Sequence, residues 1–144
     1  TITNGHMTRF LMSLDDAIDL VFYAIASGHN GDTLIKHAPA ASVRDLAIAV
    51  SNLIGSTPLE LNEVGIRYGE KIHESLISEH EIPVAKSEDG FFRIPLAREK
   101  IETFISPTKK LIEPFTSDST VQLSPAQIME MLKANYEFNL LLEV

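Results

Sequence analysis

A short stretch of charged residues, GIRYGEKIHE at residues 65–74, holds the side chains best suited to binding an anion. Arg67 comes two residues before an expected helix start, and Glu70 and Lys71 follow closely. A guanidinium and the free N–H groups of a helix N-terminus could together bind a phosphate. The alternative is a solvated helix start whose charges pair at i,i+4 spacing. The residue types alone leave both interpretations open.

The chain lacks the residues and motifs that most other kinds of functional site require. It contains no cysteine, which excludes disulfides, thiolate nucleophiles and cysteine metal sites. The motifs GxGxxG, GxxxxGKS/T, HExxH and GxSxG are absent, and no nucleophile with a neighbouring base can be named. We therefore expect no catalytic residue. We also expect no metal site, because the five histidines are scattered: His6, His29, His37, His73 and His80.

Composition narrows the class of protein. At 144 residues, with 44% hydrophobic and 22% charged residues, the chain suits one globular domain with one sizeable core. The net charge of −8 argues against broad binding to nucleic acid or to an anionic membrane. No apolar stretch approaches the roughly 20 residues of a membrane span. We therefore expect a cytoplasmic protein without nucleic-acid or membrane partners.

Hydrophobic periodicity predicts helices at residues 14–27, 43–54, 69–78 and 124–138. Serine N-caps are expected to begin three of them, namely Ser13, Ser42 and Ser124. The first helix carries an apolar stripe formed by Leu14, Ala17, Ile18, Val21, Phe22 and Ile25. Such a stripe is typical of a helix that packs on a core.

Short runs of alternating apolar residues predict strands at 33–37 and 59–66, and a hairpin of 82–86 with 91–95. Asp89-Gly90 supplies the hairpin turn. Residues 106–120 are polar and punctuated by proline, which indicates an irregular arm before the last helix. The alternation of helices and strands predicts the α/β class, with too few strands for a complete doubly wound sheet. We assign residues 1–144 to a single domain.

Five sequence blocks together resemble a known family. They are NGHMTRFLMSLDDAIDLV, KHAPAASVRDLA, GIRYGEKIHESLIS, EDGFFRIP and FTSDSTVQLSPAQIMEML. In this order they resemble the extended short-chain dehydrogenase/reductases. In their particular residues they are similar to the UDP-N-acetylglucosamine 4,6-dehydratases of capsular, surface-polysaccharide and flagellin-glycan biosynthesis.

The resemblance implies a piece of a longer enzyme. The opening TITNGHMTRF has no initiator methionine, and members of the family are much longer. We expect the C-terminal half only: a small substrate-binding lobe that lacks the N-terminal Rossmann half and is inactive alone. The full-length enzyme would use NADP or NAD, and no cofactor-binding residue is expected here. The alternatives are the lobe of a related nucleotide-sugar epimerase or reductase, or a free-standing interaction module without catalysis.

Site residues follow from the same resemblance. It implies that Arg67 binds the diphosphate of a UDP-sugar, with a salt bridge to Glu63 or Glu70 as the alternative. Glu70 would accept from a sugar or ribose hydroxyl, or else be an acid at a helix N-terminus. Arg9 would reach the phosphate or brace a substrate loop.

The alternative role for Arg9 is a structural pair with Asp15 or Asp16. Thr8 and Met7 are expected to line the same cleft. The expected partners are the UDP-sugar, the absent Rossmann half and a second copy of the chain in a homo-oligomer.

Overall fold

The computed structural model describes residues 1–55, 59–96 and 113–134. The elements in chain order are β1 (Thr8–Phe10), α1 (Leu14–Ser27), β2 (Thr33–Lys36), β3 (Ala40–Ser42), α2 (Val43–Leu53), β4 (Ser75–Ile77), β5 (Lys86–Glu88), β6 (Phe91–Ile94), β7 (Phe115–Thr116) and α3 (Pro125–Ala134). This mixture confirms the α/β class. Whether the whole chain is one domain stays a prediction.

The strands of the described residues form three small antiparallel sheets rather than one large sheet. β1 pairs with β3, β4 pairs with β7, and β6 lies between β2 and β5. Parallel pairing is limited to two isolated bridges, Ile2 with Glu63 and Ala40 with Gln122. In the part of the chain that the structure describes, there is thus no parallel sheet of the Rossmann type.

The predicted helix starts of α1 and α2 are confirmed by their caps. The Ser13 hydroxyl accepts from the Asp16 N–H, and the Asp16 carboxylate accepts from the Ser13 N–H, which forms a capping box. Ser42 accepts from the Asp45 N–H in the same way. The last helix, α3, lies within the predicted range 124–138, whose residues beyond 134 lie outside the described part.

The predicted hairpin turn and its second strand are confirmed, but the first strand lies at Lys86–Glu88 and shares only Lys86 with the predicted range 82–86. Asp89 and Gly90 take φ values of 47° and 83°, the left-handed conformation that a tight two-residue turn requires. β5 begins at Lys86 rather than at residue 82, because the preceding residues form turns. In these turns the N–H groups of Val84 and Ala85 donate to the Glu81 carbonyl.

Two predicted elements are wrong. Residues 59–66 contain a single bridging residue rather than a strand, since they run beside the N-terminal residues without a second neighbour. Residues 69–78 are not a helix. The Glu70 N–H donates to the Arg67 carbonyl at 3.1 Å, which closes a turn with Gly69 at φ 87°, and β4 follows.

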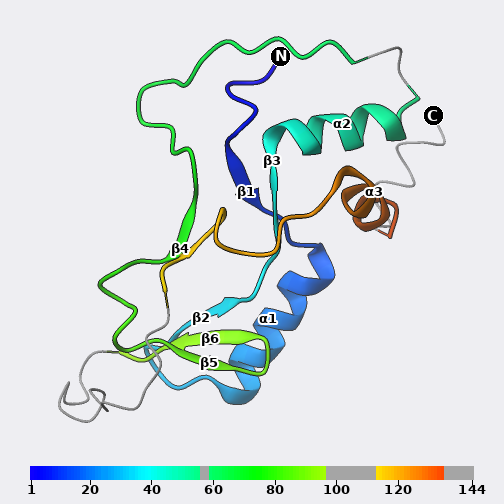
Figure 1. The fold of residues 1–144 in the computed structure, drawn as a ribbon. Helices are drawn as coiled ribbons and strands as arrows, with labels where there is room; N and C mark the ends of the chain where they lie inside the picture. Colours follow the sequence, from blue (N-terminus) through cyan, green and yellow to red (C-terminus); the bar gives the residue numbers. More distant parts are fainter. Residues whose placement is uncertain (56–58, 97–112, 135–144) are drawn as a thin grey trace.

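The irregular arm expected at 106–120 is only partly described. Residues 106–112 lie outside the described part, and residues 115–116 form the strand β7, which pairs with β4. Figure 1 shows the long segment after α2 running along one side of the molecule before it reaches β4.

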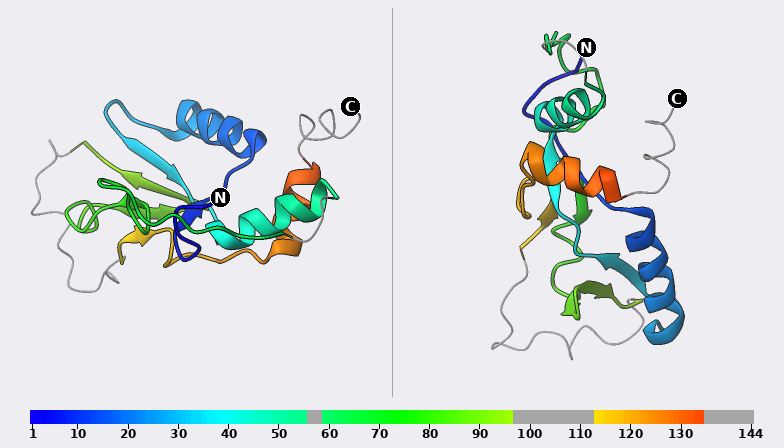
Figure 2. Two further views of the ribbon diagram at one scale, coloured as in Figure 1. Left: turned by 90° about the horizontal axis from the view of Figure 1, so that it is seen from above. Right: turned by 90° about the vertical axis from the view of Figure 1, so that its right-hand side faces the viewer.

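The described residues have two small cores. One lies around the β2–β6–β5 sheet and consists of Ile35, Ile77, Ala85, Phe92 and Ile94. The other lies where α2 meets α3 and consists of Ala41, Ala49 and Ile128. Both views of Figure 2 show α1 apart from α2 and α3. No helix of the described residues is long and apolar enough to cross a membrane.

Among the residues that the structure describes, the apolar stripe of α1 packs on no core. None of the residues of α1 is buried. The large members of the stripe are instead exposed: Leu14, Ile18, Val21, Phe22 and Ile25. The helix is therefore where the sequence predicts it, but its apolar face points outward.

Candidate functional site

The candidate site lies where β1 meets the residues before β4 and after β7. The Thr8 N–H donates to the Ile72 carbonyl at 3.0 Å, which attaches β1 to the segment containing the basic residues. On the other side of that segment, the Ser117 N–H donates to the Glu74 carbonyl at 2.8 Å. Backbone hydrogen bonds thus bring three distant parts of the sequence together.

Three side chains form a compact polar network inside this junction. Thr8 Oγ1 lies 2.6 Å from Ser117 Oγ and 2.8 Å from His73 Nδ1. Ser117 Oγ also accepts from the Glu74 N–H at 2.8 Å and donates to the Thr8 carbonyl at 3.1 Å. Thr8 is 7% exposed and Ser117 is 0% exposed. Each hydroxyl therefore has its partners within the protein.

The proton on His73 determines the direction of this network. When Nδ1 carries no hydrogen, it accepts from the Thr8 hydroxyl, and the 2.6 Å contact then has the Ser117 hydroxyl donating to Thr8 Oγ1 instead of to the Thr8 carbonyl. When Nδ1 carries a hydrogen, it donates to Thr8 Oγ1, and the Thr8 hydroxyl donates to Ser117 Oγ.

A carboxylate lies on the other side of the ring, because His73 Nε2 is 3.9 Å from Asp118 Oδ2. Hydrogen bonding from Thr116 lowers the pKa of Asp118, so this carboxylate is ionised at neutral pH. A positive charge on His73 would thus face a negative one.

Arg9 holds the basic segment in place. Its guanidinium donates to the carbonyls of Thr8 at 2.7 Å, Ile72 at 3.2 Å and Lys71 at 3.1 Å. Its Nε lies 3.6 Å from Glu74 Oε1. Such an arrangement fits the expectation that Arg9 braces a loop.

The expected alternative partner of Arg9 is not the one observed. Within the described residues Arg9 pairs with Glu74, whereas Asp16 of α1 pairs with Lys36 of β2 at 2.6 Å. Met7, expected to line the cleft, is 2% exposed and touches Arg9 through its sulfur at 3.6 Å. Met7 and Thr8 thus lie below the surface.

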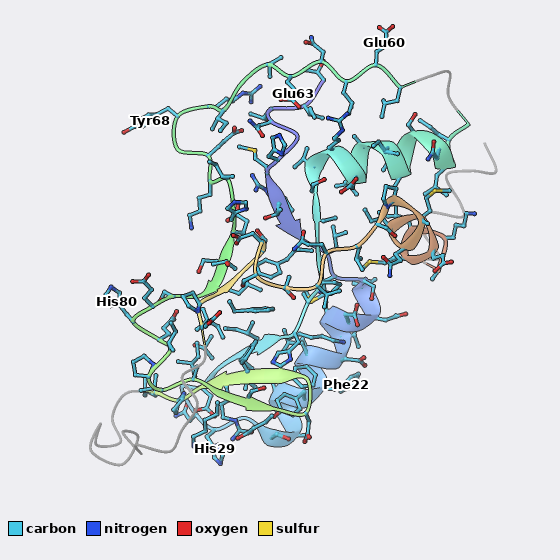
Figure 3. The ribbon with its side chains drawn as sticks, viewed as in Figure 1. Phe22, His29, Glu60, Glu63, Tyr68 and His80 are labelled. Carbon is cyan, nitrogen blue, oxygen red and sulfur yellow. The ribbon has the colours of Figure 1, made fainter. Side chains whose placement is uncertain are left out.

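Arg67 and Glu70 lie further along the same segment, in an exposed turn. Glu70 Oε2 accepts from the backbone N–H of Arg67 at 3.0 Å. Over the described ranges, the Arg67 guanidinium forms no ion pair, and the Glu63 carboxylate accepts from the Gly5 N–H instead. The predicted salt bridge to Glu63 or Glu70 is therefore not formed. Figure 3 shows the neighbouring Tyr68 pointing away from the protein.

The expected contribution of a helix N-terminus to anion binding is wrong, because no helix begins at residue 69. For the same reason Glu70 is not a helix-terminal acid; it caps a turn. An anion at this segment would have to be bound by side chains such as those of Arg67 and Lys71, both of which are exposed. Their roles stay predictions.

Sequence reasoning did not single out Ser117 or Asp118 and gave His73 a minor place. Ser117 lies 109 residues from Thr8 and 43 from Glu74, so no local spacing joins them. The available signal was the run FTSDST, rich in small polar residues, which begins a block shared with the resembled family. Among the described residues, no group of three acidic or histidine side chains could hold a metal ion.

An apolar groove lies elsewhere among the described residues. It has a volume of about 540 Å³ and lies between one face of α2 and the segments at residues 1–2 and 59–61. Its lining is mostly apolar, including Ile2, Val50 and Leu61. This lining does not suit a diphosphate.

Comparison with known proteins identifies a family and several similar proteins. The model of a family described as polysaccharide biosynthesis protein matches residues 1–95. UDP-glucose 4-epimerase of Rickettsia felis is 39% identical over 137 residues, which cover 92% of this chain and 40% of the relative. The Rickettsia prowazekii protein of the same name is 37% identical with the same coverage.

A solved structure supports the same relationship. The X-ray structure of Pen from Bacillus thuringiensis is similar with a TM-score of 0.73 and 25% sequence identity. The match covers 93% of this chain and 39% of that one. The chain thus spans about 40% of the length of the curated relatives it matches.

Proposed function

Because this chain belongs to the polysaccharide biosynthesis protein family, we propose that it is the UDP-sugar-binding portion of a nucleotide-sugar enzyme. The observation that carries the proposal is the match of nearly the whole chain to proteins named UDP-glucose 4-epimerase. The α/β fold and the similarity to Pen agree with the predicted relation to the extended short-chain dehydrogenase/reductases. On this proposal the enzyme is cytoplasmic and acts in surface-polysaccharide biosynthesis.

Arg67 is the residue that we assign to the diphosphate. Its guanidinium is exposed and forms no ion pair among the described residues, while Arg9 fixes the segment from which it projects. A planar guanidinium can donate to two phosphate oxygens at once. Glu70 Oε2 is occupied by the Arg67 N–H, so we assign only its Oε1 to a sugar hydroxyl. Thr8 and Met7 support the segment from below rather than touching the ligand.

Two reactions are compatible with this binding role. The residues of the five sequence blocks favour 4,6-dehydration of UDP-N-acetylglucosamine, whereas the names of the relatives favour 4-epimerisation of UDP-glucose. Epimerisation leaves the mass of the UDP-sugar unchanged, whereas dehydration removes one water. Mass spectrometry of the products formed by the complete enzyme would separate the two reactions.

The nicotinamide cofactor of the resembled enzymes does not fit the described residues. Such a cofactor is bound by a glycine-rich turn between a parallel strand and a helix. The glycines with positive φ are Gly31, Gly55, Gly65, Gly69 and Gly90, and none of them lies in a turn of that kind. We therefore derive no chemical step through the cofactor, and we place it in the remaining length of the complete enzyme.

The experiment that tests the binding role is a titration of UDP, UDP-glucose and UDP-N-acetylglucosamine into the chain, followed by amide NMR shifts. One charge-assisted hydrogen bond contributes about 1.5–3 kcal/mol, so Arg67→Ala should raise the Kd by about 10- to 150-fold. Arg67→Lys should recover part of the loss, because lysine keeps the charge without the planar fork.

Arg44, an exposed arginine on α2, supplies the control. Arg44→Ala should leave the Kd unchanged, because no ion pair or side-chain hydrogen bond among the described residues joins its guanidinium to Arg67 or Glu70. Equal affinity of the wild type and Arg67→Ala would remove Arg67 from the site. The absence of any shift with all three nucleotides would refute a binding role for the chain itself.

A further inference from the structure

The turn at residues 66–70, which carries the two side chains assigned to the nucleotide, is attached to the protein at both of its ends. Before the turn, the Gly65 N–H donates to the Thr3 carbonyl at 2.9 Å. After the turn, residues 71–74 are hydrogen-bonded to β1 and to Ser117. None of the residues 66–70 is buried, so the turn has no core of its own to fix it. Its position therefore depends on these two attachments.

The imidazole of His73 belongs to the second attachment and contacts two other parts of the chain. Its Nδ1 lies 2.8 Å from Thr8 Oγ1 of β1, and its Nε2 lies 3.9 Å from Asp118 Oδ2, just after β7. The side chains of His73 and Asp118 are 38% and 47% exposed, so solvent protons reach both. One titratable ring thus connects the end of the turn to β1 and to the residues after β7.

The positively charged ring is compatible with all of these contacts at once. With a hydrogen on Nδ1, His73 donates to Thr8 Oγ1. The Thr8 hydroxyl then donates to Ser117 Oγ, and the Ser117 hydroxyl donates to the Thr8 carbonyl. With a second hydrogen on Nε2, the ring carries a positive charge that faces the Asp118 carboxylate.

Each neutral form of the ring gives up one of these interactions. With a hydrogen on Nε2 alone, the Thr8 hydroxyl donates to Nδ1, and the Ser117 hydroxyl must leave the Thr8 carbonyl to donate to Thr8 Oγ1. With a hydrogen on Nδ1 alone, the Nε2 lone pair faces the Asp118 carboxylate, which is repulsive. Loss of the proton therefore loosens the second attachment of the turn.

The charged groups around the ring come from β1, from its own segment and from the residues after β7. Arg9 of β1 lies 3.6 Å from the Glu74 carboxylate, so these two charges compensate each other. Lys71, on the same segment, is exposed to solvent. Asp118 is the carboxylate that the described contacts place at the ring. Hydrogen bonding from Thr116 lowers the pKa of Asp118, so this carboxylate is still ionised where histidine takes up its proton.

We propose that His73 is a positioning residue of the nucleotide site, and that its protonation fastens the turn at residues 66–70 and raises the affinity for a UDP-sugar. The inference rests on the proposed function. A loop that is already fixed loses less conformational freedom when a ligand binds, so the ligand binds more tightly. In this role His73 acts through Thr8 and Asp118 and does not touch the ligand.

The test is the pH dependence of UDP-glucose binding by isothermal titration calorimetry from about pH 8 to about pH 5, where histidine changes its charge. Both phosphates of UDP-glucose are esterified, so the ligand keeps its charge over this range. The Kd should fall about two- to fivefold as the pH falls, because a half-exposed ion pair is a small effect. His73→Gln should remove this pH dependence, because an amide side chain takes up no proton, and its Kd should stay at the weaker value.

A matched control and a second variant separate positioning from other effects. His80 is exposed and lies at the edge of the molecule in Figure 3, so His80→Gln should leave the pH dependence intact. Asp118→Asn removes the charge that faces the ring and should reduce the pH dependence to less than twofold. If His73 instead contacted the phosphates directly, Asp118→Asn would keep the full pH dependence, and the positioning role would be refuted.

A measurement without ligand tests the same connection. The amide NMR signal of Glu74, whose N–H donates to Ser117 Oγ, should shift together with the ring signals of His73 as the pH changes. A Glu74 signal that ignores the His73 titration would overturn the inference. A Kd that does not change with pH, or a pH dependence that survives in His73→Gln, would overturn it while leaving the proposed function in place. If UDP-glucose fails to bind at every pH, the proposed function fails and the inference fails with it.

Discussion

Ser117 is the residue whose loss should best reveal the polar network at the junction of β1, β4 and β7. Its side chain is completely buried, and Ser117→Ala removes an oxygen that accepts from the Glu74 N–H and contacts the Thr8 hydroxyl and carbonyl. The Thr8 hydroxyl keeps His73 Nδ1 and the Thr8 carbonyl keeps the Arg9 guanidinium as partners. The substitution therefore leaves the Glu74 N–H without its acceptor at a completely buried side chain.

The loss of stability can be estimated from the cost of leaving a buried donor without an acceptor. An ordinary hydrogen bond contributes about 1 kcal/mol, but a buried donor left without a partner costs about 1–3 kcal/mol. We expect Ser117→Ala to lower the free energy of unfolding by about 2–3 kcal/mol. For a chain of this size that corresponds to a fall in Tm of about 5–10 °C.

Urea denaturation followed by circular dichroism measures this change. Thr8→Val removes the neighbouring hydroxyl at similar volume, and a double-mutant cycle with Ser117→Ala should give a coupling energy of about 1 kcal/mol. Ser87→Ala is the control. Ser87 is exposed, and its hydroxyl makes one long contact of 3.5 Å with His37 Nε2. The free energy of unfolding should therefore change by less than about 0.5 kcal/mol. A Ser117→Ala variant as stable as this control would refute the reasoning.

Three further outcomes are expected. Hydrogen bonds from Lys36 and Ser13 lower the pKa of Asp16 to about 2, so its stabilisation is complete above the unfolded pKa of 3.8 and is lost as the pH falls toward 2. Because Asp16 is partly exposed, its interactions contribute about 1 kcal/mol to the free energy of unfolding after solvent screening. The wild type should be more stable than Asp16→Asn above pH 3.8, and this difference should shrink as the pH falls toward 2. Gly69→Ala should destabilise the chain by about 1 kcal/mol in thermal melts, since φ is 87° and no neighbouring atom is crowded. Arg67→Ala should leave the urea midpoint unchanged while it weakens UDP binding, because its guanidinium supports no other described residue.

Local signals explain which parts of the fold could be predicted from the sequence. The Ser13 capping box and the Asp89-Gly90 turn both act within a few residues, so the sequence predicts α1 and the hairpin turn at the right places. The predicted helix at 69–78 rested on Ile72 and Leu76, whose i,i+4 spacing suits a helix. There β7 lies about forty residues away and pairs with β4, and this long-range pairing decides the conformation.

The site shows the same limit more strongly. Thr8, Arg9 and Met7 could be selected because they lie in one block, and the structure does bring them next to residues 71–74. Ser117 completes the network from a sequence distance of 109 residues, and nothing in the periodicity of either segment records that contact. Hydroxyl groups also give a weak sequence signal, since a buried and an exposed serine look alike until their partners are known.

The apolar stripe of α1 shows that the periodicity of a helix and its burial are separate properties. Periodicity is a property of the chain alone, and it correctly indicates that one side of residues 14–27 is apolar. Burial is a property of the chain with its neighbours, and the described residues leave that side open. The polar contacts of Asp16 and Tyr23 show that α1 is nonetheless firmly attached, so the open face does not result from an unattached helix. Within the described residues, α1 is thus held in place by its inner side while its apolar side stays exposed.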